Sequence, residues 1–300
     1  MARHSRGVSR LRRALAILEA FTIEAPFLTL SDVAERSDMP VSTAHGIVAE
    51  LVSEGLLERM ADRSYRVGTR LWEIGSRTPG VLGLREIALP FLHGVQAGVR
   101  QHAQLAVHSG LDVLIIERLS ARDAVVNASI VGGRIPLEHS SSGHVLLAYL
   151  EEDLIPDIVR LQRPSPITGE AMGEAELRRI IGRVRREGYA VAEGYIHQAS
   201  RGIAVPVRGA QGVVVAALGV VVANDGTSPA NYVRVLKHAA SNISAALRRS
   251  YLPSGHPQAG PGGSYRRMVQ SSDQSMQYLE AHAEAEASTM TREPPDARHR

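Results

Sequence analysis

Residues 29–67 read TLSDVAERSDMPVSTAHGIVAELVSEGLLERMADRSYRV, and this stretch sets the fold of the N-terminal part of the chain. It opens with a helix-capping signal at Thr29, which predicts a short helix, and a turn follows that ends at Pro40. A longer helix is predicted over 41–54, with Gly55 as its stop. Its inward-facing apolar residues recur at helical spacing and are Ala44, Ile47, Val48 and Leu51.

A hairpin follows the longer helix. Two short strands of alternating character are predicted over 57–60 and 65–67, and they flank a polar turn. Another helix is predicted upstream, over 11–21. This order is that of a winged helix-turn-helix, whose second helix enters the major groove of duplex DNA while the preceding helix crosses the backbone. We therefore predict a DNA-binding domain over 9–70. A second interpretation is a small protein-interaction module.

The positive charge gathers at the start of the chain. The net charge is only +3 in 300 residues, but the first thirteen residues carry Arg3, Arg6, Arg10, Arg12 and Arg13 without an acidic neighbour. A basic arm beside a folded module is typical of proteins that bind nucleic acid. A solvated N-terminus can have the same composition. We assign residues 1–8 as this arm.

Polar and basic residues of the predicted DNA-binding domain are its candidate DNA contacts. Hydroxyl groups and free N–H groups at the start of a recognition helix can contact phosphates or base edges. Arginines on the hairpin can reach phosphates or the minor groove. An exposed histidine alone is usually just a surface residue. The candidates are Arg10, Ser31, Ser42, Thr43, His45, Arg59, Arg63 and Arg66.

From residue 84 onward the pattern changes to that of a second domain. Residues 71–83 are assigned as a linker helix, 84–253 as an α+β domain, and 254–300, rich in Gly, Pro, Ser and Gln, as a disordered tail. The order of elements predicts an antiparallel sheet with helices outside it. Predicted strands cover 104–108, 113–119, 125–131, 189–192, 202–207 and 213–222, and predicted helices cover 84–99, 143–150, 153–161, 174–186 and 231–249.

Composition and motifs argue against several other classes of function. The chain has no cysteine, which rules out disulfides, thiolate metal sites and cysteine nucleophiles. It has no G-x-S-x-G elbow and no metal-ligand spacing such as H-E-x-x-H, so no catalytic residues, metal or cofactor are expected. No apolar run is long enough to span a bilayer, and the start lacks a secretory signal. We therefore expect a cytoplasmic protein with no membrane partner.

The order and spacing of several short motifs resemble the isocitrate lyase regulator (IclR) family of bacterial transcription factors over about residues 9–253. In the first domain the motifs are RLRRALAILEAF (10–21), LSDVA (30–34), PVSTAH (40–45), EGLL (54–57) and YRVG (65–68). In the second domain they are PLEHSSSG (136–143), GYAVAE (188–193) and GIAVPV (202–207).

The resemblance implies a winged-helix DNA-binding domain, a linker helix and a GAF-like effector-binding domain. It also implies a homodimer, often paired into a homotetramer, on pseudo-palindromic operator DNA. A small-molecule effector, often an aromatic or short-chain organic acid, binds the second domain, and repressors as well as activators occur. The effector-binding residues expected here are Glu138, Ser140, Ser142, Gly143, Glu193 and Ala204. The serines before the helix at 143 are also typical of an ordinary N-cap.

The chain departs from the family pattern at three positions. Val41 and Gly46 stand where family members usually carry basic residues, which shifts the expected DNA contacts toward Arg59, Arg63 and the N-terminal arm. A glycine inside a helix is also less favourable than alanine by about 1 kcal/mol. Glu138 occupies a position that is commonly histidine, and an acidic side chain there disfavours an anionic ligand unless it is paired.

Two hypotheses follow for the function. The favoured one is a ligand-responsive transcriptional regulator that binds operator DNA as a homodimer or homotetramer. The competing hypothesis is a metabolite-binding module whose N-terminal domain serves dimerisation alone, without a DNA role.

Overall fold

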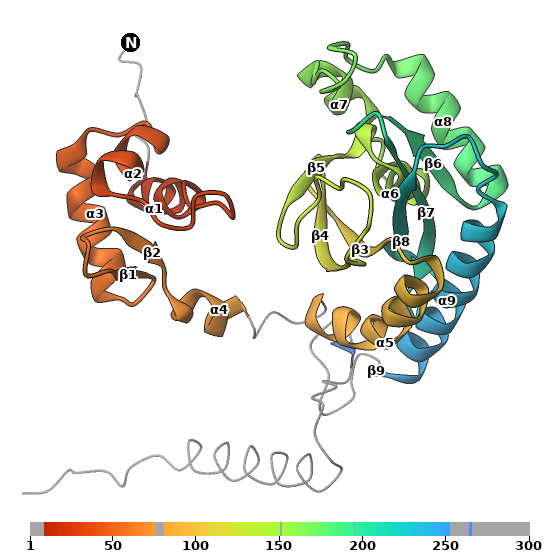
Figure 1. Ribbon diagram of the computed structural model, residues 1–300, viewed down its shortest axis with the longest axis horizontal. Coiled ribbons are helices and arrows are strands. Elements are labelled where there is room, and N and C mark those ends of the chain that lie inside the picture. The colour runs from red at the N-terminus through yellow and green to blue at the C-terminus, as the bar shows by residue number, and fades with distance from the viewer. Residues whose placement is uncertain (1–8, 76–80, 151, 195, 253–263, 266–300) are drawn as a thin grey trace, which may run out of the picture. The chain divides into compact units, whose positions relative to one another are not determined.

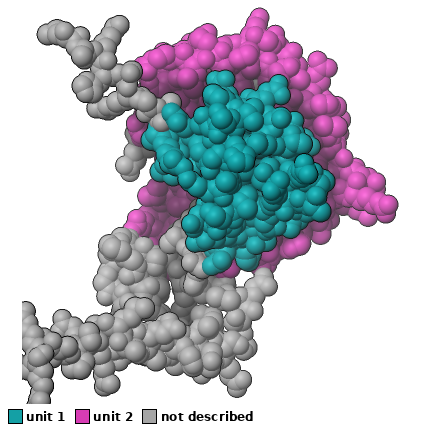
Figure 2. Space-filling model, turned by 90° about the vertical axis from the view of Figure 1, so that its left-hand side faces the viewer, with its two compact units in different colours: residues 1–78 teal, residues 79–300 magenta. Residues whose placement is uncertain are grey.

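The computed structural model describes residues 9–75, 81–150, 152–194, 196–252 and 264–265 (Figure 1). The chain separates into two compact units, Met1–Thr78 and Pro79–Arg300 (Figure 2), and each unit has its own hydrophobic core. The predicted arm over 1–8 lies outside the described residues, as does almost all of the predicted tail over 254–300.

The N-terminal unit is a winged helix-turn-helix, as its sequence predicts. The elements in chain order are α1 (Arg10–Glu19), α2 (Leu30–Arg36), α3 (Val41–Ser53), β1 (Leu57–Arg59), β2 (Tyr65–Val67) and α4 (Thr69–Gly75). Helices α1, α2 and α3 pack on one another, and α3 also packs on the hairpin, around a core that includes Ile17, Val33, Ile47 and Leu57.

Local hydrogen bonds set the ends of these helices. At the start of α2 the backbone N–H of Thr29 donates to Asp32 Oδ2 at 2.8 Å, and the Thr29 hydroxyl accepts from Asp32 N at 3.3 Å. This is a capping box, and it confirms the predicted capping signal. Gly55 ends α3 with a φ of +71°, and Leu56 N then donates to Leu51 O at 2.8 Å. Glycine adopts this left-handed conformation with little strain.

The hairpin is fixed to the rest of the unit through Leu28. Strands β1 and β2 pair antiparallel, and Leu28 exchanges two backbone hydrogen bonds with Tyr65, at 3.0 and 2.8 Å. Leu28 and Tyr65 are both buried in the core. The hairpin is therefore part of the folded unit, and its tip is held in a defined place relative to α3.

The second unit is built on a six-stranded antiparallel sheet, as predicted for an α+β domain. The strand order is β5-β4-β3-β8-β7-β6. The strands are β3 (His102–Ser109), β4 (Asp112–Leu119), β5 (Arg134–Pro136), β6 (Ala190–Glu193), β7 (Ser200–Arg208) and β8 (Val214–Ala223). A further short pair joins β9 (Tyr251–Leu252) to β10 (Ser264–Tyr265).

Helices cover both faces of this sheet. On one face, α5 (Val81–Val99) and α9 (Ala230–Arg249) pack against large aliphatic residues of the strands, such as Ile203 and Leu218. On the other face lie α6 (Ser141–Tyr149), α7 (Ile155–Leu161) and α8 (Glu174–Glu187), against a second core cluster. None of the described helices combines the length and apolar character that a bilayer-spanning helix needs.

Small residues on the strands let α6 approach the sheet closely. A Cβ atom added to Gly202 would lie 2.6 Å from Ser141 Oγ, and one added to Gly219 would lie 3.5 Å from Ser142 Oγ. Ala204 occupies the position between them on the same face of the sheet. As a result α6 is buried along its length from Ser141 to Ala148, although it is not a uniformly apolar helix.

The strand predicted over 125–131 is wrong. The chain there is irregular, and the edge strand is β5 instead. Side chains rather than a strand ladder satisfy its backbone groups, because Val125 N donates to Gln101 Oε1 at 2.9 Å and Ser129 N donates to Asn127 Oδ1 at 2.9 Å. The apolar residues of this segment alternate as they do in a strand, which is why a strand was predicted. Such alternation gives no information about hydrogen bonds from side chains to the backbone.

Candidate functional site

The outward face of α3 carries the candidate recognition residues of the first unit. Ser42 and His45 are exposed and Thr43 is partly exposed, while the opposite face of the helix packs into the core. The helix begins after Pro40 without a side-chain cap, and the N–H of Thr43 donates to the carbonyl oxygen of Pro40 at 2.9 Å. Ser31 is exposed in the first turn of α2.

Two of the candidate arginines are held by carboxylates of the same unit. Arg10 Nε donates to Glu50 Oε2 at 3.0 Å, and Arg66 donates from Nε and Nη2 to Glu58 Oε2 at 2.9 and 2.7 Å. Glu58 and Arg66 are opposite each other in the hairpin, and this hydrogen bond lowers the pKa of Glu58. A phosphate must compete with these carboxylates, which weakens what Arg10 and Arg66 can offer to DNA.

Arg59 and Arg63 are placed differently. Within the described residues, neither side chain makes a hydrogen bond or ion pair, and both are exposed. Arg63 stands at the hairpin tip with a φ of +69°. The Asp62 carboxylate closes this turn by accepting from the hydroxyl and N–H of Ser64 at 2.6 and 2.9 Å, which lowers the pKa of Asp62. The turn therefore presents Arg63 to solvent.

Gly46 lies on the same exposed face of α3. A Cβ atom added there would meet nothing within 4 Å. The fold of the described unit therefore does not require glycine at this position.

In the second unit, the start of α6 is the other candidate site. Ser140 caps the helix, because its hydroxyl accepts from Gly143 N at 3.0 Å. A side chain on Gly143 would overlap the carbonyl group of Leu137, so the passage from the 3-10 helix η1 (Leu137–His139) into α6 requires glycine. Ser142 and Gly143 are buried against the sheet.

A small cavity of about 50 Å³ lies beside this helix start. Of the predicted effector-binding residues, Ser140 lines it, whereas Ala204 lies deeper in the core between α6 and the sheet. The cavity wall combines hydroxyl, amide and imidazole groups with apolar side chains. The lining residues are Gln104, Asn127, Ala128, Ser129, Ile135, His139, Ser140, Ser141, Ala192, Ile196, Ser200, Gly202 and Val221.

Glu138 is buried in a network of charges. Its carboxylate accepts from Arg163 Nε and Nη2 at 2.8 and 2.6 Å, and Arg163 Nη1 donates to Asp112 Oδ1 at 2.7 Å. Burial lowers the pKa of Arg163, but these hydrogen bonds and charges outweigh it and the net shift is upward. The expected conflict between Glu138 and an anionic ligand is thus removed, since the carboxylate is paired.

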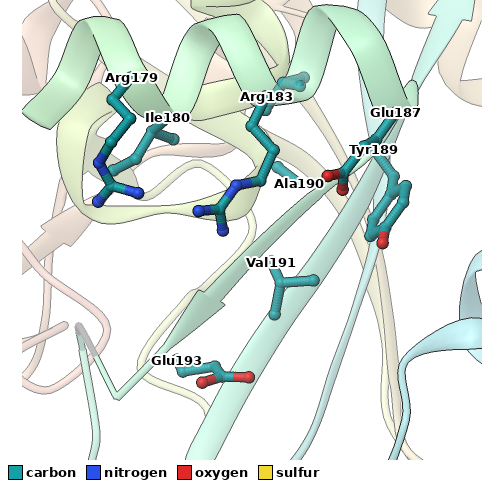
Figure 3. Close-up of a pocket in the computed structure, with 9 residues that line it drawn as sticks. Arg179, Ile180, Arg183, Glu187, Tyr189, Ala190, Val191 and Glu193 are labelled. Atoms are coloured by element: carbon teal, nitrogen blue, oxygen red, sulfur yellow. The ribbon is translucent and has the colours of Figure 1, made fainter.

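Glu193 lies in a different depression, shown in Figure 3. This is a wider groove of about 530 Å³ between α8 and the edge strand β6. Arg179 and Arg183 extend into it from α8, while Glu193 stands at the end of β6 (Figure 3). Glu193 is largely exposed, and the groove lacks the buried polar groups that the cavity beside α6 provides.

Several lining residues of the cavity are not among the predicted ones. Gln104, Asn127, Ser129 and Ser200 come from three separate segments of the chain that the sheet topology brings together. For Asn127 the sequence did hold a signal, because an asparagine two residues before a serine is typical of an Asx turn. The strand predicted over 125–131 concealed it.

Comparisons with known proteins place the chain among regulators. The family model described as "Bacterial transcriptional regulator IclR C-terminal" matches residues 78–245, and the "IclR helix-turn-helix domain" matches residues 10–61. The HTH-type transcriptional regulator XynR of Escherichia coli is 26% identical over 245 residues, which cover 80% of this chain and 97% of that protein. The Pca regulon regulatory protein of Pseudomonas putida is 26% identical over 215 residues, covering 71% and 74%.

Solved structures agree with this result. An IclR homologue from Microbacterium hydrocarbonoxydans, crystallised with 4-hydroxybenzoate, is 40% identical with a TM-score of 0.74, covering 81% of this chain and 100% of that one. The IclR protein of Thermotoga maritima, at 24% identity, has a TM-score of 0.62 over 79% of this chain and 98% of its own, and shares the fold.

Proposed function

Because this chain belongs to the IclR family of bacterial transcriptional regulators, we propose that it binds a pseudo-palindromic operator as a homodimer or homotetramer and that a small molecule in its second domain changes the operator affinity. Such a regulator acts on chromosomal DNA in the cytoplasm. The observation that carries the proposal is the exposed start of α3, flanked by the unpaired arginines of the hairpin.

The DNA contacts divide into two kinds. The outward face of α3 is proposed to contact base edges in the major groove through Ser42, Thr43 and His45. Ser31 is proposed to contact the DNA backbone beside them. Arg59 and Arg63 are proposed to contact phosphates, because no carboxylate of the described unit holds them. Arg10 and Arg66 are proposed to add weaker phosphate contacts, since their carboxylate partners compete.

Exposed apolar residues support assembly through the first unit. Leu11 and Leu15 lie four residues apart on α1 and are 71% and 48% exposed, and Trp72 on α4 is 78% exposed. Apolar side chains of this size gather on a surface mainly where another surface covers it. We propose that these residues form the dimer surface and that its two-fold axis places one copy of α3 on each half of a pseudo-palindromic site.

The ligand proposed for the second unit is a small organic acid. The start of α6 offers the positive end of a helix dipole, and Ser140 and Ser141 there line the cavity. Glu138 does not repel an anion, because Arg163 neutralises it. The similar Microbacterium protein is bound to 4-hydroxybenzoate. The cavity of about 50 Å³ is smaller than usual ligand sites of roughly 300 Å³ or more, so its walls must move apart on binding.

Such a movement supplies the switch. A ligand that binds one arrangement of the second units more tightly than another shifts the population toward that arrangement. If the recognition helices are spaced differently in the two arrangements, the ligand changes the free energy of operator binding. The operator then changes the free energy of ligand binding by the same amount.

Binding of the full chain to its own upstream DNA tests the proposal. At about 0.1 M salt, where phosphate contacts are still effective, we expect one duplex to be bound specifically. Arg63→Ala should weaken all duplexes by a similar factor and reduce the salt dependence by about one charge, whereas Ser42→Ala should change the sequence preference. Arg186→Ala, which removes an exposed arginine of α8, is the control for loss of charge.

The competing hypothesis makes the opposite forecast. A module that only dimerises through its N-terminal domain would remain a dimer and bind the organic acid, but it would bind no duplex above the level of random DNA. That result would overturn the regulator proposal.

A further inference from the structure

Two arginines of α8 border the groove of about 530 Å³ between this helix and the edge strand β6. Arg179 and Arg183 are four residues apart, so they lie on the same side of the helix, and both extend into the groove (Figure 3). Both are exposed, and among the described residues neither has a hydrogen-bond or ion-pair partner. The adjacent Arg178, in contrast, is held by Glu174 and Asp153 at 2.8 and 2.9 Å. The groove therefore offers two guanidinium groups to an acidic partner.

The other charged groups at the groove already have partners. Burial, followed by the charge and the hydrogen bond of Glu187, raises the pKa of the Tyr189 hydroxyl. Glu193 Oε1 lies 3.9 Å from Nη1 of the buried Arg201. Lys237 stands at the end of the groove, because its Nζ donates to the carbonyl oxygen of Glu187 at 2.9 Å and lies 5.5 Å from the centre of the Tyr189 ring. The cations at the groove thus outnumber its carboxylates.

The chain itself contains a segment of matching chemistry, residues 268–291, which lies outside the described residues. The segment has no arginine or lysine, and between two of its carboxylates it carries the apolar residues Met276, Tyr278 and Leu279. The wall of the groove is likewise apolar between its charges, at Ile180 and Val191. The carboxylates of the segment are Asp273, Glu280, Glu284 and Glu286.

The segment is long enough to reach the groove. Tyr265 pairs with Tyr251, which lies two residues after the end of α9 at Arg249. Lys237 lies twelve residues before that end, which is about 18 Å along a helix. The fifteen residues from Tyr265 to Glu280 span up to about 50 Å when extended. The carboxylates of the segment can therefore meet the groove without strain on the chain.

We propose that residues 268–291 dock in the groove between α8 and β6 of the same chain, with their carboxylates on Arg179 and Arg183. The contact is separate from the DNA and effector sites proposed above, and the segment lies beyond residue 245, where the family match ends. Docking there covers β6, an edge strand that is otherwise open to pairing with another copy.

Lys237 makes the contact measurable, because it is the only lysine of the chain. A carbodiimide joins a lysine amine to a carboxylate beside it with loss of water, and mass spectrometry of the treated full chain identifies that carboxylate. We expect Lys237 to be joined to a carboxylate of residues 273–286, in a product with the mass of one chain. About 1 M salt should largely abolish this product, because it shortens the screening length to about 3 Å.

Variants on both sides of the contact complete the design. In the double variant Arg179→Ala/Arg183→Ala the yield should fall by about fivefold or more, since one exposed ion pair contributes up to about fivefold to an affinity. Glu280→Gln with Glu284→Gln leaves α8 unchanged, and it should lower the yield at the remaining carboxylates of the segment. Arg234→Ala removes an exposed arginine of α9 that does not line the groove, and it should leave the yield unchanged.

Three results would overturn the inference. The first is the absence of any product between Lys237 and the segment. The second is an unchanged yield in Arg179→Ala/Arg183→Ala. The third is a product with the mass of two chains, which would place the segment on another copy.

Discussion

At the scale of single residues, His144 shows how burial sets protonation in the second unit. It is fully buried on α6, and Nε2 donates to the carbonyl oxygen of Glu138 at 2.8 Å. Burial lowers the pKa of His144 to about 4, against a smaller upward effect of that hydrogen bond and a further downward effect of the neighbouring His139. The imidazole is therefore neutral in the folded protein at neutral pH.

This shift predicts a loss of stability in mild acid. Below pH 6.5 His144 is protonated in the unfolded chain, whereas in the folded protein it stays neutral until the pH falls to about 4. The free energy of unfolding therefore has its full value, as far as His144 is concerned, above pH 6.5. It decreases by roughly 3 kcal/mol as the pH falls toward 4. Urea unfolding between pH 7 and 4.5 should show a weaker pH dependence for His144→Gln than for the unchanged chain.

An exposed histidine provides the control for this experiment. His238→Gln on α9 should keep the pH dependence of the unchanged chain. The same steep dependence in His144→Gln would contradict the role given to His144.

Residue-level prediction from sequence succeeded where the interaction is local. The capping residues Thr29 and Ser140 lie within three positions of the backbone N–H groups that they accept from, so their capping roles follow from short motifs. Glu138 and Arg163 lie 25 positions apart, and only the folded sheet and its loops bring them together. The charge network could therefore not be derived from spacing along the chain.

At the scale of elements, two glycines of the first unit can be compared directly, Gly46 inside α3 and Gly68 just after β2. Gly46 has open space where a side chain would go, whereas a side chain on Gly68 would overlap the carbonyl oxygen of Gly55. Alanine is more favourable than glycine inside a helix by about 1 kcal/mol. Gly46→Ala should therefore stabilise the first unit and raise its melting temperature by about 4–8 °C, as measured by calorimetry.

Gly68→Ala is the matched opposite and should lower the melting temperature of the same unit. Destabilisation by Gly46→Ala would contradict the open space seen at α3. If Gly46→Ala stabilises the unit but weakens operator binding, close approach of DNA is what requires glycine there.

Elements with strong periodicity were predictable. The hairpin and helices α1, α2 and α3 agree with the sequence to within a few residues, and so do α8 and α9, because each of these helices buries a single stripe. The segment 125–131 was not predictable in this way, since its backbone is held by side chains of residues such as Gln101. The helix predicted over 143–150 is confirmed as α6, although this helix is buried along its length from Ser141 to Ala148 and not along a single stripe.

At the scale of the whole molecule, assembly should depend on the apolar surface of α1 and α4. Leu15→Glu places a charge within the proposed dimer surface, and we expect monomers in light scattering after gel filtration and weaker operator binding. Its melting temperature as a monomer should stay close to normal, because the side chain is half exposed. Leu161→Glu on α7, at a similar exposure in the other unit, should remain assembled, and loss of assembly there instead would contradict the proposal.

Trp72 gives the molecule a built-in optical reporter. It is the only tryptophan of the chain, and it stands exposed on α4 of the first unit. The fluorescence of the protein excited at long ultraviolet wavelength therefore comes from that helix, while the cavity beside α6 belongs to the other unit. An organic acid that alters the emission of Trp72 without contacting it would reveal communication between the units in a single cuvette, with no label attached.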